Sequence, residues 1–171
     1  MLTLQKINAM TKKEFVTKFA SLYECSPWVA GGASGERPFG SVDEMHAAFE
    51  RVVAAASDRR RLALIAAHPD LAGKAAINGE LTEESAGEQA SVGLDRLSPE
   101  EFEAFTRINR AYREKFSIPM IVCVRGHTKW SILRQAEKRL SSTKDAQVRA
   151  ALGEIAKIAR LRLNDIVEEE D

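Results

Sequence analysis

The sequence has no excess of either charge and no long hydrophobic run. Lys plus Arg and Asp plus Glu both total 25 in 171 residues, so no net charge favours binding to nucleic acid or to an anionic membrane. No stretch reaches the roughly 20 apolar residues that a membrane-spanning helix requires. These absences argue against a nucleic-acid-binding protein and against a membrane protein.

Cysteines and targeting signals are also scarce. Cys25 and Cys123 are the two cysteines of the chain, and they lack metal-ligand spacing. The first residues lack the charged and apolar regions of a signal peptide, and the C-terminal Val-Glu-Glu-Glu-Asp is neither a peroxisomal nor a lipidation signal. We therefore expect a cytoplasmic protein with two free thiols.

Length and hydrophobic content indicate one domain. A chain of 171 residues lies near the usual size of a single domain, and a hydrophobic fraction of 44% is enough for one core. No shift in composition, internal repeat or low-complexity tract divides the chain. The sequence predicts a single domain over residues 1–171.

Helix-start signals recur along the chain. A side-chain oxygen followed three residues later by Glu, which is typical of a helix N-cap, occurs at Thr11, Ser41 and Ser98. Pro99 suits the first helical position and predicts a helix over about 99–115. Apolar residues at three- and four-residue steps mark this helix and four others: Phe102, Phe105, Ile108, Tyr112 and Phe116; Phe15, Phe19 and Leu22; Met45, Phe49, Val52 and Val53; Leu62, Leu64 and Ile65; Trp130, Leu133 and Leu140.

The remaining segments differ in composition. Helical spacing predicts a long final helix over about 144–168. Glycine and proline predict loops over 28–40 and 73–82. Residues 118–124 are apolar and rich in β-branched side chains, which favours an extended segment near 118–125. A lone extended segment cannot satisfy its own backbone, so it could form the wall of a ligand site.

Together these patterns predict the fold class. We expect an all-α, single-domain helical bundle that contains one short extended segment. His68 falls at the end of an apolar helix, where Pro69 stops the helix and holds the histidine between core and solvent. Imidazole titrates near neutrality, so this position suits a general acid. A histidine that merely caps the helix is the alternative.

A second polar group lies in the next expected helix. Ser85, Glu88 and Gln89 occupy positions i, i+3 and i+4 of a helix that begins near Glu83, so they project from one face. A hydroxyl, a carboxylate and an amide would converge there. A solvated polar face is the alternative.

Three motifs follow one another along the chain: His68-Pro69-Asp70-Leu71, then Ser85-Ala-Gly-Glu88-Gln89, then Ile118-Pro119 followed by Ile121-Val-Cys-Val-Arg125-Gly. In this order they resemble the family of 2-oxo-4-hydroxy-4-carboxy-5-ureidoimidazoline (OHCU) decarboxylases. The resemblance continues through Pro38-Phe39, Asn109-Arg-Ala-Tyr112 and Arg162-Leu163. It departs at Met120, where many relatives have an aromatic residue, and at His127, where lysine is common.

The resemblance implies a carboxy-lyase of urate degradation that converts OHCU to (S)-allantoin. It implies no metal and no organic cofactor, an all-helical fold and a homodimer. By matching motif, His68 would be the general acid and Glu88 would assist it. The residues expected to bind the substrate are Pro69, Ser85, Gln89, Met120, Ile121, Val122, Cys123, Val124 and Arg125.

Other functions fit parts of the sequence. A metal site could use the three histidines, but none shows His-x-x-x-His or Glu-x-x-His spacing. A helical interaction module could dock an acidic partner on residues 59–61. A nucleophilic Cys123 would lie in an apolar run, which disfavours the reactive thiolate.

Overall fold

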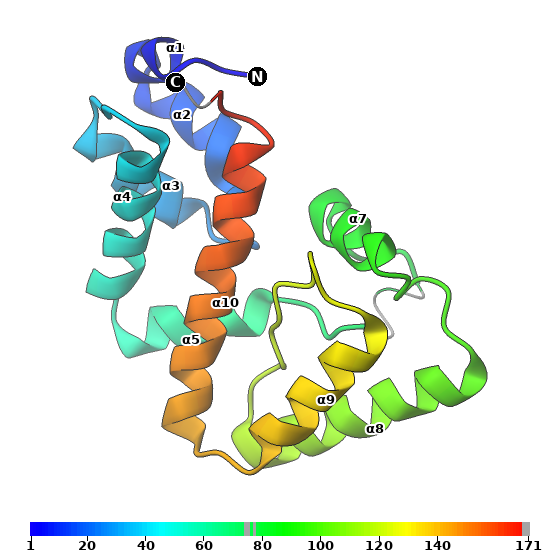
Figure 1. Cartoon of the computed structure of the whole chain (residues 1–171). Coiled ribbons are helices and arrows are strands. Elements are labelled where there is room, and N and C mark those ends of the chain that lie inside the picture. Colours follow the sequence, from blue (N-terminus) through cyan, green and yellow to red (C-terminus); the bar gives the residue numbers. More distant parts are fainter. Residues whose placement is uncertain (74–75, 77, 169–171) are drawn as a thin grey trace. The chain divides into compact units, whose positions relative to one another are not determined.

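The computed structural model describes residues 1–73, 76 and 78–168, and α-helices dominate it (Figure 1). The chain forms two compact units, Met1–Ala67 together with the chain from Ile155 onward, and His68–Glu154. Within the described residues there is no β-strand; Leu2 and Val167 form one isolated parallel bridge. The predicted all-α fold is confirmed, and the single domain over 1–171 remains a prediction.

The first unit contains five complete helices among its described residues. They are α1 (Leu4–Ala9), α2 (Lys12–Phe19), α3 (Pro27–Ala33), α4 (Val42–Ala55) and α5 (Asp58–Ala67), with short 3-10 turns at Ala20–Leu22 and Ser34–Glu36. The last part of α10 (Lys144–Asn164) also belongs to this unit. Two predicted N-caps are present. Thr11 forms a capping box with Glu14, and the Ser41 side chain accepts a hydrogen bond from the backbone N–H of Glu44. Local sequence therefore determines where α2 and α4 begin.

Aromatic rings fill the core of the first unit. The ring centroid of Phe15 lies 4.8 Å from that of Phe19 and 6.0 Å from that of Phe49, and Tyr23 stacks on Phe49 at 6.0 Å. All four side chains are buried. Tilted and offset rings attract one another by about 0.5–1.5 kcal/mol beyond the burial of their area.

The predicted loop over residues 28–40 is wrong in its first part, because α3 occupies Pro27–Ala33. Pro27 stands at the start of this helix, where a proline is tolerated. Gly32 is needed for packing rather than for a turn, since a Cβ there would lie 2.7 Å from Cγ1 of Val52 in α4. The glycines that indicated a loop instead allow α3 to approach α4 closely.

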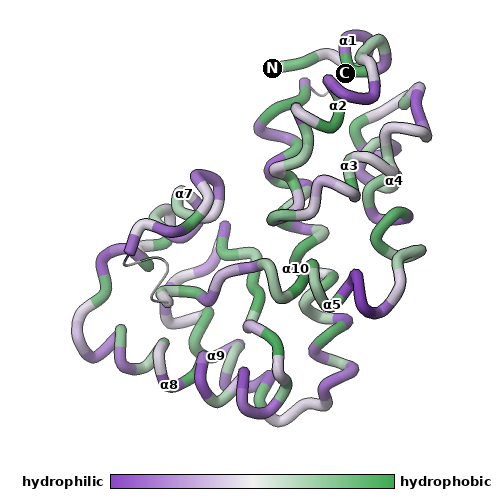
Figure 2. The backbone as a smooth tube through the Cα atoms, turned by 180° about the vertical axis from the view of Figure 1, so that it is seen from behind, coloured by the Kyte–Doolittle hydropathy of each residue, from purple (hydrophilic) through white to green (hydrophobic). Residues whose placement is uncertain are grey.

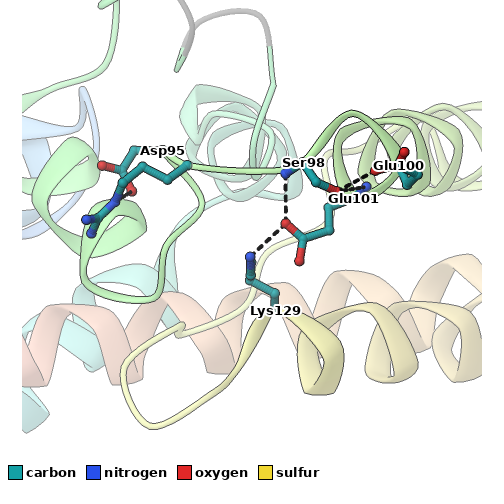
Figure 3. Close-up of polar contacts among 6 residues, drawn as sticks. Asp95, Ser98, Glu100, Glu101 and Lys129 are labelled. Atoms are coloured by element: carbon teal, nitrogen blue, oxygen red, sulfur yellow. Dashed lines mark hydrogen bonds and ion pairs between the residues drawn. The ribbon is translucent and has the colours of Figure 1, made fainter.

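The second unit contains α7 (Glu83–Ser91), α8 (Pro99–Phe116), α9 (Lys129–Leu140) and the first part of α10. The capping box predicted at Ser98 forms with Glu101 (Figure 3). The predicted stripe of α8 is buried apart from its first member, Phe102, which is half-buried. α9 packs along α8 (Figure 1).

The predicted helix marked by Trp130 is confirmed, but its buried face differs. Ile132 and Ala136 are fully buried, whereas Trp130 is 59% exposed. Leu62, a predicted marker of the α5 helix, is also exposed, while Leu64 and Ile65 are buried. Apolar character alone therefore identified these two helices, but it assigned Trp130 and Leu62 wrongly to their buried faces.

The last helix ends earlier than predicted. α10 stops at Asn164 rather than at residue 168. The N–H of Leu2 donates to the C=O of Ile166 at 2.8 Å, and the N–H of Glu168 donates to the C=O of Leu2 at 3.0 Å. The N-terminal residues thus take up backbone groups that a longer helix would have used.

The expected extended segment lies between α8 and α9. Pro119–Val124 is neither helical nor part of a ladder, and Ile118 and residues 120–124 are buried. Of the expected loop over 73–82, residues 74, 75 and 77 lie outside the described residues. Residue 76 is helical, against the prediction, whereas 78–82 lie outside helices, with a turn at 78–79 and a bend at 81. Hydrophilic residues recur along the longer helices (Figure 2). No helix in the described part of the chain is long and apolar enough to cross a membrane.

Candidate active site

Every residue predicted for the site belongs to the second unit, His68–Glu154. α5 ends at Ala67, so His68 directly follows a helix and Pro69 stands beyond its end, as predicted. His68 is 6% exposed and Pro69 is half-buried. The histidine is therefore enclosed rather than displayed on a solvated helix end.

Gln89 joins α7 to the loop that follows His68. Its Oε1 accepts the N–H of Ala72 at 2.9 Å, and its Nε2 donates to the C=O of Asp70 at 3.4 Å. Gln89 is 5% exposed. Leaving buried peptide groups unpaired is costly, so these bonds hold the loop against α7.

The predicted polar face of α7 is enclosed as well. Ser85 and Gln89 are buried and Glu88 is half-buried. The hydroxyl of Thr82 caps the helix by accepting the N–H of Ser85 at 3.3 Å. This arrangement excludes the alternative of a fully solvated face and brings α7 next to the loop that follows His68.

Two residues of α8 that sequence reasoning left without a role hold the same loop. Nδ2 of Asn109 donates to the C=O of Leu71 at 2.8 Å, and Nε of Arg113 contacts both carboxylate oxygens of Asp70 at 3.0 Å. Asn109 is buried. A signal for it was present, because an amide interrupts an apolar helical stripe immediately after Ile108.

The extended segment Met120–Val124 is held by two further residues that the sequence did not indicate. The N–H of Cys123 donates to Oε2 of Glu154 at 2.7 Å, and Nη1 of Arg139 donates to the C=O of Ile121 at 2.7 Å. The segment therefore has a fixed backbone without belonging to a sheet. We call it the wall.

Arg125 lies beyond the wall, in the turn 125–126, and is exposed. Gly126 follows with φ of +85°, a backbone conformation that favours glycine. Its neighbour His127 places Nδ1 3.1 Å from Oγ of Ser131. Arg125 is predicted to complete the pocket with its side chain. Its exposed position places it at the rim of the predicted site, and its role in binding stays a prediction.

The histidines do not form a cluster. In the first unit, Nε2 of His46 lies 3.0 Å from the C=O of Ala156, while His68 and His127 belong to the second unit. Across the described ranges, no three His, Cys, Asp or Glu side chains are grouped so that they could hold a metal ion. The candidate functional groups of the site are its peptide groups and the side chains of His68, Ser85, Glu88 and Gln89.

The sequence and the fold are similar to those of known proteins. The sequence profile of OHCU decarboxylase matches residues 8–164. The 2-oxo-4-hydroxy-4-carboxy-5-ureidoimidazoline decarboxylase of Haloferax volcanii is 42% identical over 95% of this chain and 94% of its own. A crystal structure of (S)-allantoin synthase matches with a TM-score of 0.80 at 25% identity, covering 98% of this chain and 54% of that one.

A second solved structure supports the fold. It is an OHCU decarboxylase in the presence of (S)-allantoin, and it matches with a TM-score of 0.68 at 19% identity over 87% of this chain and 96% of its own. The three motifs, the all-helical fold and a profile match over residues 8–164 agree with one another. The chain belongs to the OHCU decarboxylase family.

Proposed function

We propose that this protein decarboxylates OHCU to (S)-allantoin in urate degradation, without a cofactor. Its family and the name of its Haloferax volcanii relative support this reaction. The structural observation that carries the proposal is the bonding of Gln89 to the loop that follows His68. It brings the face of α7 that bears Ser85 and Glu88 next to the histidine's loop.

The substrate itself can accept the electron pair that decarboxylation leaves behind. When the bond between the ring carbon and the carboxylate breaks, carbon dioxide leaves and the electron pair moves into the adjacent ring C=N, forming an enamine. The ring nitrogen takes up a proton, and the hydroxyl loses its proton as it becomes the ring carbonyl. A proton added to one face of the neighbouring prochiral carbon then gives allantoin of one configuration. The protein has to orient the carboxylate, stabilise the developing charge and control that proton.

His68 and Glu88 suit these tasks. In the proposal His68 contacts the hydroxyl and carboxylate region of the substrate during bond breaking and serves as general acid, a role that imidazole can fill because it exchanges protons near neutral pH. In the proposal the carboxylate of Glu88 orients the His68 ring or keeps it protonated. The site in this proposal keeps bulk water away from the enamine, which water would otherwise protonate on either face.

The polar groups of the site match a ureido group and a ring amide. Val122 in the wall presents both an N–H and a C=O, and Ser85 adds a hydroxyl. Gln89 uses one N–H for the loop and keeps a second. We propose that these groups bind the substrate, with Pro69 and the rest of the wall shaping the pocket and Arg125 at its rim.

The same proposal extends to assembly and location. The family resemblance implies a homodimer, and the proposal places the enzyme in the cytoplasm. Sedimentation of the purified protein tests the dimer, which predicts twice the mass of one 18.9 kDa chain. A monomer with full activity would remove the dimer from the proposal and leave the reaction intact.

The first test follows freshly made OHCU by circular dichroism, after urate oxidation and hydrolysis, with and without the protein. Rapid appearance of the (S)-allantoin signal would support the reaction. His68→Asn keeps the size and some hydrogen bonding of the residue but removes the titrating group, so we expect kcat to fall by about 10²–10⁴-fold. Near-normal turnover in this variant would remove the general-acid role, and formation of racemic product at the spontaneous rate by the wild type would refute the function.

A further inference from the structure

The wall, Met120–Val124, is held along one edge by a buried ion pair. Glu154 accepts the N–H of Cys123 through Oε2, and Arg139 donates to the C=O of Ile121 through Nη1, both at 2.7 Å. The two side chains also contact each other, with Nη2 of Arg139 3.5 Å from Oε1 of Glu154. One charged pair therefore bridges a peptide donor and a peptide acceptor of the same segment.

The spacing of these two bonds determines which edge of the wall is used. In an extended chain successive residues direct their peptide groups to opposite edges, so Ile121 and Cys123 share one edge and Val122 presents the other. Val122 is 2% exposed. Within the described part of the chain, neither its N–H nor its C=O has a hydrogen-bond partner. Buried peptide groups require partners, and a ureido substrate offers both an acceptor and a donor.

Stability alone is a poor explanation for the pair. The side chains of Arg139 and Glu154 are 12% and 8% exposed. Removing two charges from water costs free energy that their attraction recovers only partly, so a buried ion pair adds little net stability. Its specific effect is to fix the geometry of the groups that it bonds.

The pair is anchored in the packed part of the unit. Arg139 lies in the last turn of α9 and Glu154 lies in α10. Next to Arg139 is Tyr112 of α8, whose burial raises the pKa of its hydroxyl while Arg139 opposes that rise. This hydroxyl donates to Oε1 of buried Gln147 at 2.7 Å. The position of the wall is thus tied to three helices.

We propose that Arg139 and Glu154 are positioning residues of the decarboxylase. They hold the Ile121 and Cys123 edge of the wall so that the peptide groups of Val122 meet the substrate. Neither side chain touches the substrate in this role. The inference rests on the proposed function, since it assigns a purpose to the wall of that site.

Three variants test the role. Glu154→Ala removes the charge and the acceptor, Arg139→Met keeps much of the side-chain length but removes the donor, and Glu154→Gln removes the charge but keeps an oxygen acceptor. Misplacing a binding group by about 1 Å can cost about 10²-fold, so we expect Glu154→Ala and Arg139→Met to lower kcat/KM by about 10- to 100-fold, mainly through KM. Glu154→Gln should recover most of this loss.

Glu101→Gln is the matched control. Glu101 combines the same two contacts in the same unit, since its Oε2 accepts the N–H of Ser98 at 2.9 Å and lies 2.7 Å from Nζ of Lys129 (Figure 3). It does not contact the wall through either bond. We expect Glu101→Gln to lower the unfolding midpoint and to leave KM for OHCU unchanged.

Amide hydrogen exchange gives a second readout. In Glu154→Ala the amide of Cys123 should exchange faster, while the buried amides of α8 keep their rates. Folded Glu154→Ala and Arg139→Met proteins with kcat/KM within about twofold of wild type would overturn the inference. An equal rise of KM in Glu101→Gln would also overturn it, because general destabilisation would then explain the loss. If the wild type does not turn over OHCU, the proposed function itself fails, which is a separate outcome.

Discussion

The two units of the chain use buried polar side chains differently. In the first unit, a cluster of aromatic rings dominates the core, and buried Arg162 pairs with Glu24 and donates to the C=O of Ser21. In the second unit, buried polar side chains concentrate on two non-helical segments, the loop that follows His68 and the wall. Both units have apolar cores and side chains that bond peptide groups, but in the second unit several such side chains converge on two neighbouring non-helical segments.

This difference indicates how a helical protein can build a site without a sheet. Helices satisfy their own peptide groups, so a site that uses peptide groups needs chain that leaves the helix. Such chain has to be fixed by side chains. Gln89, Asn109, Arg139 and Glu154 do so in the second unit, and each bonds a peptide group of one of the two segments.

The comparison predicts that a change in the aromatic core affects stability and not chemistry. Phe49 is 1% exposed and contacts three aromatic rings. Phe49→Ala should lower the free energy of unfolding by about 3–5 kcal/mol, because it leaves a cavity in the first unit. Urea unfolding measures this loss. The value of kcat/KM at a temperature where the variant is folded should stay near wild type, and a tenfold fall would contradict the separation of roles.

The second prediction compares the side-chain amides of Gln89 and Asn8, each of which hydrogen-bonds one backbone N–H and one backbone C=O of a loop. Gln89→Ala frees the loop that follows His68 and should lower kcat/KM by about 10²-fold, with a loss of stability of about 1–3 kcal/mol. Asn8 makes the equivalent contacts in the first unit, to the C=O of Phe39 at 2.9 Å and its N–H at 2.8 Å.

Asn8→Ala is therefore the control for Gln89→Ala. It should lose a similar free energy of unfolding and keep its kcat/KM. Steady-state kinetics and urea unfolding of both variants decide the comparison. If both lose activity equally, loop bonding in general matters and Gln89 has no special position.

The smallest expected effect concerns a cap outside the two segments. Hydrogen bonds from Lys129 and then from the Ser98 amide hold the pKa of Glu101 below its ordinary value of 4.5. A carboxylate with a lowered folded-state pKa stabilises the protein above its unfolded pKa, and this contribution is lost as pH falls through the lowered value. Wild type should therefore exceed Glu101→Gln in unfolding free energy at neutral pH, and the difference should shrink below pH 4.5. A difference independent of pH would show that the charge of Glu101 is unimportant.

Local features were predictable from sequence because their causes are local. The capping box at Ser98 requires only residues 98–101, and the stripe of α8 requires only helical spacing. The end of α5 before Pro69 follows from the steric effect of proline on the preceding residue. The apolar run at 118–124 likewise indicated a break between helices.

Features that depend on distant residues were missed or assigned wrongly. α3 contains glycines that favour a loop, yet Gly32 serves its contact with α4. Trp130 has apolar character but lies on the exposed face of α9. Nothing in the local sequence distinguishes Arg139 and Glu154 from the many charged residues on solvated helix faces.

The sequence by itself determined the helical class, the ends of several helices, the family and the residues expected to bear the chemistry. Those results depend on neighbours within a few positions or on motifs that stand in order along the chain. The tertiary structure alone decided that Gln89 and Asn109 fix the loop that follows His68 and that a charged pair fixes the wall. Arg139 meets Ile121 across 18 positions and Glu154 meets Cys123 across 31, and only the packing of helices against one another can bring such partners within hydrogen-bonding distance.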